Sequence, residues 1–534
     1  MPLASENKAE FPQIERSGPM TPTAPDALCL SPVWKQHVWF GLIGLVGTGW
    51  LWFAMSRHGI GLSPDSVGYL AVAQHLLEGK GFLSYRGEPF VLQPPLYPLV
   101  IATISFLLGS TPATSALLIN LLLFVAVAYF SGRLAILITK SFPISIAVCI
   151  SVILGVPITW VSVFAWSEIL FILLTILAFL NLIGFVSSKD KKDLLVCSLY
   201  LACSCMVRYA GLFSVFSFLL FLILMPGERL QKKTYRIVAF LYISSLPISL
   251  WILRNYILSG TPFGPRTMAS LRPNEIIFLF FDTFSGWFIV QTDALQNDII
   301  LILILIFLTF AVSTACIYQI KDTNILSLVI FVFTYSLFVF ISSVRFAYDP
   351  IDNRLLSPVF IPLVIVLLNF SNKVLYPYLK SKVSSSAQSR LIILGAVIWF
   401  THPVLSTLTL GFEVRQEGKG YHAIYWQTSP TLAQVRQARE RLIRLPIYTN
   451  DPEGLYFLAH IRAEHLPFRF RSTWPESGQA YLIRFKHAYR GGCLDIIEGL
   501  RQAADIKPLA QFSDGEIYLV THKSLLASPT LVPH

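Results

Sequence analysis

Charged residues are scarce in this chain of 534 residues. Asp, Glu, Lys and Arg together make up only 13% of it, whereas soluble proteins carry about 25%. Hydrophobic residues make up 54%, and the mean hydropathy is +0.62. This composition excludes an ordinary soluble enzyme and a disordered chain, because either needs more charge in contact with water. The apolar residues form uninterrupted runs, which also excludes an outer-membrane barrel with alternating polar and apolar positions.

Several sequence signatures are lacking as well. The 7 cysteines form no CxxC pair, so neither a metal site nor a disulfide framework is predicted. There is no internal repeat, no Gly-rich phosphate loop and no dinucleotide-binding fingerprint. The net charge of +11 resides largely in short loops between apolar runs rather than in one basic stripe. Nucleic acid is therefore not an expected partner.

The apolar runs predict an all-α polytopic membrane domain over residues 38–410, with about 11–13 transmembrane helices at about 20 residues each. The run at 193–225 is too long for one span and is expected to form two, broken near Arg208. The run at 94–109 is expected not to cross fully, unless Arg133 and Lys140 are misplaced in the topology. The other runs are 38–55, 113–138, 143–162, 167–187, 236–253, 299–319, 325–343, 355–370 and 391–410, with an interrupted, re-entrant or interfacial segment at 276–290.

The positions of Lys and Arg predict the orientation. The clusters Lys189–Lys192, Arg229–Arg236 and Lys373–Arg390 should face the cytosol under the positive-inside rule. The polar residues 1–37 then form a disordered cytosolic tail, and the first loop, 56–93, lies on the opposite side.

Residues 411–534 are mixed in composition and predict a small extracytoplasmic α/β domain with two helices, two strands and a β-hairpin. Sequons are scarce in the exposed loops, which favours a bacterial inner membrane.

Two acidic residues and three arginines are the informative polar groups, because an ionisable side chain at membrane depth indicates a functional site. Asp65 and Glu168 could be no more than helix starts. Arg208 lies inside an apolar run, where a charge costs about 3 kcal/mol, so it requires an anionic partner. Arg254 and Arg354 lie at span ends and could simply reach the interface.

Span counting puts all five groups on the non-cytosolic side, and their combined chemistry suggests a reaction. A carboxylate can act as a general base toward a hydroxyl acceptor, and arginines can hold a phosphate leaving group. A reaction that needs both in a membrane cavity is sugar transfer from a lipid-linked phosphosugar. A soluble nucleotide-sugar donor fits poorly on that side of the membrane.

The chain resembles the GT-C membrane glycosyltransferases, in particular the group with dolichyl-phosphate-mannose protein mannosyltransferases and the lipid A aminoarabinose transferase. The resemblance covers roughly residues 38–370, and the matching motifs are PDSVGYLAVAQHLLEGKGF, QPPLYPLVIA, WSEILF, RYAGL, WILRNYILSGTPFG and NRLLSPVFIPL. It implies a polyprenyl-phosphate sugar donor, a hexosyl- or pentosyltransferase activity, and single displacement with inversion. The acceptor would be a lipid, a glycan or a protein.

The resemblance also implies roles for individual residues. Asp65 and Glu168 match the family's acidic positions and are expected to be catalytic. The expected substrate-binding residues are Tyr69, His75, Gln93, Arg208, Tyr209, Arg254 and Arg354. Some relatives carry two adjacent acidic residues where this chain has Asp65-Ser66, so a requirement for a divalent metal is not excluded. No cofactor or metal is expected.

The main alternative function is a secondary transporter or flippase for a lipid-linked or anionic substrate. Such a protein would also have about a dozen spans and buried charges. It should, however, show two related halves with broken helices at matching places, and none are found here.

Overall fold

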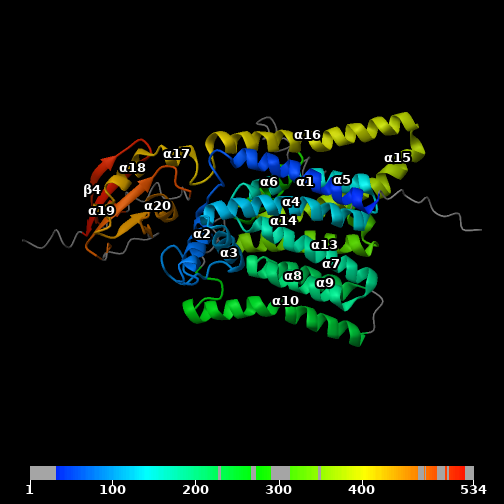
Figure 1. The fold of residues 1–534 in the computed structure, drawn as a ribbon, viewed down its shortest axis with the longest axis horizontal. Helices are drawn as coiled ribbons and strands as arrows, with labels where there is room; N and C mark the ends of the chain where they lie inside the picture. The colour runs from blue at the N-terminus through cyan, green and yellow to red at the C-terminus, as the bar shows by residue number, and fades with distance from the viewer. Residues whose placement is uncertain are drawn as a thin grey trace, which may run out of the picture.

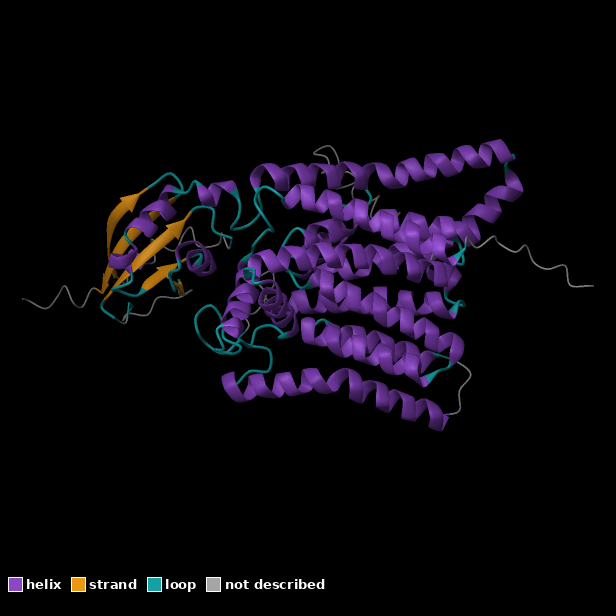
Figure 2. Cartoon of the chain, viewed as in Figure 1, coloured by secondary structure: helices purple, strands orange, loops and turns teal. Residues whose placement is uncertain are grey.

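The structure is a computed structural model in which long helices run side by side and a small sheet-containing domain stands at one end (Figures 1 and 2). The described residues are 32–225, 230–265, 272–289, 313–314, 316–346, 350–466, 474–475, 477–489, 500–501 and 504–522. Most of the predicted tail (1–31) and most of the predicted span 299–319 lie outside them.

Within the described residues, 7 helices are long and apolar enough to cross a membrane, so the chain is an integral multi-pass membrane protein. These helices are α1 (Val33–Met55), α4 (Pro112–Thr139), α7 (Glu168–Ser188), α10 (Leu230–Ser259), α13 (Thr323–Arg345), α14 (Asn353–Phe370, continued by η2, Ser371–Leu375, and α15, Tyr376–Lys382) and α16 (Ser385–Glu417). An eighth span forms if α5 (Phe142–Leu154) and α6 (Val156–Ser162), bent by 49°, count as one. The bend lies at Gly155, where a side chain would collide with the ring of Phe360.

Shorter helices fill the rest of the membrane domain, and two of them confirm the predicted break. The run 193–225 divides into α8 (Lys191–Val207) and α9 (Gly211–Leu224), with Arg208 in the extended backbone between them. The run 94–109 forms α3 (Leu96–Leu108), whose 13 residues span about 20 Å and so fall short of a full crossing. Two further short helices are α2 (Pro64–Leu77) and α11 (Pro273–Ser285).

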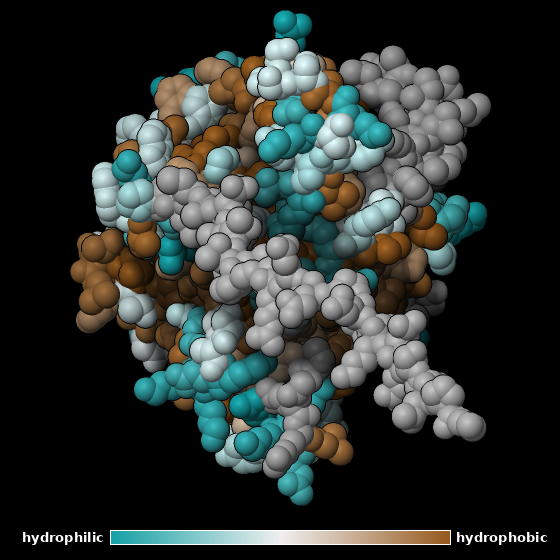
Figure 3. All heavy atoms as spheres, turned by 90° about the vertical axis from the view of Figure 1, so that its right-hand side faces the viewer, coloured by the Kyte–Doolittle hydropathy of each residue, from teal (hydrophilic) through white to brown (hydrophobic). Residues whose placement is uncertain are grey.

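The helix directions separate two chemically different ends. The starts of α7 and α14 and the ends of α8 and α16 lie toward the sheet-containing domain (Figure 1). Lys189–Lys192, where α7 ends and α8 begins, and the lysines of α15 lie at the opposite end (Figure 1), a face on which hydrophilic and hydrophobic side chains are mixed (Figure 3). Glu168, Arg208 and Arg354 therefore share one end of the membrane domain, as the charge pattern predicted.

The C-terminal domain follows α16, which continues to Glu417, and is built on a 5-stranded sheet with the order β2-β1-β3-β5-β4. β1 runs parallel to β2 and β3, whereas β5 runs antiparallel to β3 and β4. The predicted hairpin is confirmed as β4 and β5. The strands are β1 (Ile447–Thr449), β2 (Glu464–His465), β3 (Gln479–Phe485), β4 (Ala504–Gln511) and β5 (Gly515–His522), and the helices are α17 (Ile424–Gln427), α18 (Pro430–Gln437), α19 (Arg439–Leu442) and α20 (Pro452–Ala459).

Three segments that are distant in sequence pair where the two domains meet, and we call residues 61–62, 163–165 and 419–421 the junction. The Gly61 amide donates to the Val163 carbonyl at 2.7 Å, and the Tyr421 amide donates to the Leu62 carbonyl at 2.8 Å. Gly420 has φ +58°, and a Cβ there would lie 1.8 Å from the Leu62 oxygen. Only glycine allows this approach. The junction thus joins the first loop to the segment before α7 and to the C-terminal domain.

Replacing Gly420 with alanine should destabilise the protein by about 2 kcal/mol or more, because the added methyl group forces the junction apart and the backbone conformation is strained. Thermal unfolding of the purified protein measures the effect. Gly395→Ala in α16 is the matched control, since no atom lies within 4 Å of its Cβ position. Equal melting temperatures for Gly420→Ala and the control would contradict the proposed packing of the junction.

Candidate active site

Asp65 and Glu168 each stand in the first turn of a helix that begins just beyond the junction. Asp65 is the second residue of α2, but Ser63 is the N-cap, with its Oγ accepting from the Ser66 amide at 3.3 Å. Asp65 is therefore not the cap of its helix, and its carboxylate is directed elsewhere. Glu168 is the first residue of α7. Both carboxylates gain from the positive end of a helix dipole.

Arg354 links these two carboxylates. It lies in the first turn of α14, which Asp352 caps through the backbone amide of Arg354 at 2.9 Å. Its Nη2 is 2.5 Å from Oδ2 of Asp65, and its Nε is 2.5 Å from Oε1 of Glu168. Its guanidinium carbon is 4.4 Å from the ring centroid of Trp166, close enough for a cation–π interaction.

Arg208 is the second cation that contacts Glu168. Its Nη1 lies 2.5 Å from Oε1 of Glu168 and donates to Oγ of Ser167 at 3.1 Å. Charges thus alternate in the order Asp65, Arg354, Glu168, Arg208, which we call the ion-pair chain. It supplies the anionic partner that the sequence predicted for Arg208.

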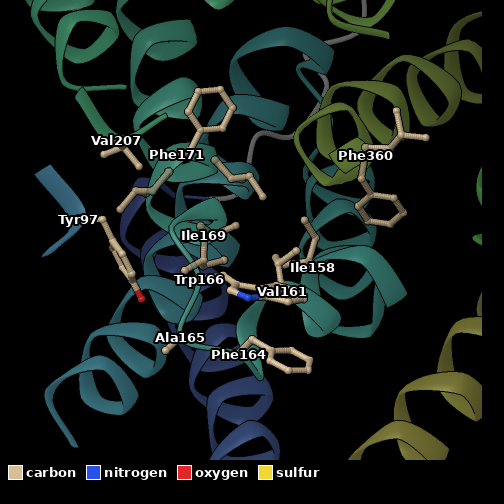
Figure 4. Packing of buried hydrophobic residues seen from close by; sticks show 14 of the residues in the cluster. Tyr97, Ile158, Val161, Phe164, Ala165, Trp166, Ile169, Phe171, Val207 and Phe360 are labelled. Atoms are coloured by element: carbon tan, nitrogen blue, oxygen red, sulfur yellow. The ribbon is translucent and has the colours of Figure 1, made fainter. Parts of the chain in front are cut away.

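Gln93 and Tyr69 complete the surroundings of the ion-pair chain. Nε2 of Gln93 donates to Oδ1 of Asp65 at 3.0 Å, and the Tyr69 hydroxyl lies 3.1 Å from Oγ of Ser167. Burial, reinforced by the charge of Asp65, raises the pKa of the Tyr69 hydroxyl well above its ordinary value, so it stays protonated. Apolar side chains around Trp166, among them Tyr97 and Phe164, pack behind this region (Figure 4).

The two carboxylates differ sharply in their access to solvent. The Glu168 side chain is 1% exposed, whereas that of Asp65 is 31% exposed. Both guanidinium contacts go to one oxygen of Glu168, and its Oε2 has no hydrogen-bond partner among the described residues. Glu168 is therefore enclosed between two cations, and Asp65 is the carboxylate that a second molecule can reach.

The other three predicted site residues, His75, Tyr209 and Arg254, contact backbone carbonyls between positions 83 and 91 of the first loop. Arg254 Nη1 donates to the carbonyl of Phe90 at 2.9 Å, and the Tyr209 hydroxyl donates to the next carbonyl along the chain at 3.2 Å. A ring nitrogen of His75 lies 2.9 Å from the carbonyl of Leu83. These contacts hold the segment that leads to Gln93, and a direct role of the three residues in substrate binding stays a prediction.

Sequence reasoning did not assign several residues that shape the site. Ser63 also accepts from Trp166 Nε1 at 2.7 Å, which ties the start of α2 to the segment before α7. Trp166 and Ser167 belong to the WSEILF motif that carries Glu168, but the motif alone does not indicate what these two residues contact. Within the described ranges, no group of three or more His, Cys, Asp or Glu side chains could hold a metal ion.

Comparisons with known proteins identify the fold. No protein-family model matches the chain, and no curated protein matches it in sequence. Among solved structures, ArnT from Cupriavidus metallidurans in the apo state matches with a TM-score of 0.56 at 12% identity, covering 90% of this chain and 97% of that one. ArnT bound to undecaprenyl phosphate gives a TM-score of 0.56 at 12% identity, with coverages of 94% and 100%.

An archaeal structure is similar over most of the same residues. The oligosaccharyltransferase AglB from Archaeoglobus fulgidus, in complex with an inhibitory peptide and a dolichol-phosphate, gives a TM-score of 0.57 at 10% identity. The match covers 94% of this chain and 75% of that one. The chain therefore has the GT-C fold, in agreement with the resemblance seen in its motifs.

Removing the carboxylate of Glu168 should be strongly destabilising, because Arg208 and Arg354 would lose the anion that they share. We expect Glu168→Ala to lower the free energy of unfolding by about 3–5 kcal/mol. Denaturant unfolding measures the loss. Glu440→Ala is the control, since Glu440 is 82% exposed and should change stability by less than about 0.5 kcal/mol. A loss at Glu168 no larger than that of the control would contradict the ion-pair chain.

Proposed function

We propose that this protein is a glycosyltransferase that moves a sugar from a polyprenyl-phosphate donor to an acceptor hydroxyl. The observation that carries the proposal is the ion-pair chain, which places a reachable carboxylate, Asp65, beside Arg354 and links it through Glu168 to Arg208 at one end of the membrane domain. A carboxylate can take a proton from a hydroxyl, and guanidinium groups can hold phosphate.

The arrangement of charge suits a leaving group that becomes more negative. A sugar linked to a polyprenyl phosphate is a phosphodiester with one negative charge. The polyprenyl phosphate that departs is a monoester with a second ionisable oxygen. Arg208 and Arg354 would therefore interact more strongly with the leaving phosphate than with the bound donor, and such a difference lowers the barrier of the chemical step.

We assign different roles to the two acidic residues that the sequence predicted as catalytic. Asp65 is the base, because its side chain is 31% exposed and can contact an acceptor. Glu168, at 1% exposure and between two arginines, is a positioning residue that fixes both guanidinium groups. Gln93 orients the carboxylate of Asp65 through its hydrogen bond to Oδ1.

The reaction follows from these roles. The acceptor hydroxyl gives its proton to Asp65, and its oxygen attacks the anomeric carbon of the sugar. The bond from that carbon to the phosphate oxygen breaks on the opposite face, and its electron pair leaves with the polyprenyl phosphate. One displacement of this kind inverts the anomeric configuration. The transferred sugar is a hexosyl or pentosyl group, and the acceptor is a lipid, a glycan or a protein.

The distribution of cations and the structural neighbours support the location and the donor class. Lysine clusters lie at the end of the membrane domain opposite the ion-pair chain, and the positive-inside rule favours a cytosolic position for this lysine-rich end. The site and the C-terminal domain would then lie on the extracytoplasmic side of a bacterial inner membrane. Undecaprenyl phosphate and dolichol-phosphate are bound in two of the structures with the same fold. A polyprenyl-phosphate donor is consistent with both observations.

Replacing Asp65 with asparagine should lower transfer by a factor of about 10²–10⁴, because the amide cannot accept the hydroxyl proton. Binding of the lipid phosphate should persist. Mass spectrometry of envelope glycolipids, in cells lacking the protein and complemented with each variant, measures transfer and also identifies the missing sugar and acceptor. Asp505→Asn, an exposed change on β4, is the control. Full transfer by Asp65→Asn would instead favour a transporter or flippase.

Replacing Arg354 should weaken phosphate binding before any chemistry takes place. We expect Arg354→Lys to bind undecaprenyl phosphate about tenfold less tightly, because lysine keeps the charge but loses the paired N–H donors. Titration of the purified protein with this lipid in detergent, followed by native mass spectrometry, measures affinity. Arg345→Lys at the exposed end of α13 is the control. Unchanged affinity at Arg354 would argue against a phosphate site in the ion-pair chain.

A further inference from the structure

The tip of the first loop is a short hairpin that lies against the C-terminal domain. Leu83 and Pro89 pair in antiparallel fashion, and the Ser84 amide donates to the Glu88 carbonyl at 2.7 Å. From this hairpin, residues 83–89, the buried Tyr85 donates its hydroxyl hydrogen to Oε1 of Glu453 at 3.2 Å. Two parts of the chain separated by 368 positions are thus joined by a buried, charge-assisted hydrogen bond.

Glu453 is held firmly on its own side of this contact. It lies in the first turn of α20, directly after β1, and the helix is capped by Asp451 through the Gly454 amide at 3.0 Å. The Glu453 residue is 7% exposed, and Nε2 of His465 on β2 lies 3.6 Å from its Oε1. The C-terminal domain therefore fixes the Glu453 carboxylate, which accepts the hydrogen bond from the Tyr85 hydroxyl.

The Tyr85 hydroxyl serves as a donor here, and its ring adds a second contact to α20. Burial, with the neighbouring charge of Glu453, raises the pKa of Tyr85 above its ordinary value, so the hydrogen is retained. The rings of Tyr85 and Tyr456 have centroids 5.6 Å apart. Gly87, in the turn of the hairpin, is also close to the C-terminal domain, since a Cβ at this position would lie 3.1 Å from Nη1 of Arg462.

A short stretch of backbone connects this contact to the carboxylate of Asp65. After the hairpin, the Phe90 amide donates to the Phe82 carbonyl at 2.9 Å, which closes the base of the loop. Gln93 follows and donates to Asp65. The other end of the first loop is fixed independently, because Leu62 pairs with Gly420 at the junction.

We propose that the C-terminal domain is a positioning part of the active site, in which Glu453 acts through Tyr85 to set the place of Gln93 and Asp65. This inference rests on the proposed function of Asp65. Tyr85 and Glu453 are then positioning residues for sugar transfer, and the task of the C-terminal domain is to hold the first loop so that Asp65 stays in place. Small displacements of a catalytic group can slow a reaction a hundredfold.

Hydrogen exchange of the full-length protein in detergent tests the positioning directly. In Tyr85→Phe, amide exchange across residues 82–93 should become about tenfold faster, because the hairpin loses its bond to α20. Exchange in β3 and β5 should stay unchanged. Tyr425→Phe is the matched control, since this exposed tyrosine lies in the C-terminal domain with its ring tilted against those of Trp426 and His487. Unchanged exchange at 82–93 would overturn the proposal.

Transfer in complemented cells provides the second readout. Tyr85→Phe and Glu453→Ala should each lower the rate of transfer about tenfold, with undecaprenyl phosphate affinity unchanged. Glu453→Gln should restore much of the rate, because its amide oxygen still accepts the Tyr85 hydrogen. Faster exchange at 82–93 with full transfer would overturn the positioning of Asp65. If Asp65→Asn also transferred fully, the proposed function itself would fail, while the exchange result would still report on the hairpin.

Discussion

One oxygen of Glu168 accepts both Arg208 and Arg354, and the arrangement of the membrane domain depends on this contact. Each of the three groups belongs to a different part of the helical array, namely the start of α7, the start of α14 and the gap between α8 and α9. Removing such charges from water costs several kcal/mol per ion, and only close pairing with an opposite charge offsets this cost. The buried pairing therefore holds the starts of α7 and α14 and the gap between α8 and α9 together at the same end of the helical array.

Much of this architecture could be predicted from local patterns. The length of the apolar run 193–225, too great for one span, correctly indicated a break near Arg208. The start of α20 has a local signal in Asp451, its cap, and Pro452, its first residue, and the turn residues before β5 indicate its hairpin with β4. In each case the determining interaction lies within a few residues.

Partners from distant segments could not be predicted in this way. Leu62 pairs with Gly420, and Tyr85 with Glu453, because the packing of the whole chain brings them together. The different environments of Asp65 and Glu168 could not be predicted either. In the sequence, both are acidic residues at helix starts. In the structure, the Asp65 side chain is 31% exposed and reachable, whereas the Glu168 side chain is 1% exposed and enclosed.

The contacts of the first loop give the C-terminal domain a task in the proposed site. Fixing a loop of this length costs considerable conformational entropy, which contacts along the loop must offset. Here the loop is held at its entry by the junction, at its tip by α20 and on its return by Arg254 and Tyr209. These contacts divide the loop into short tethered segments. A carboxylate on one such segment can stay partly open to a substrate and still keep a fixed position beside Arg354.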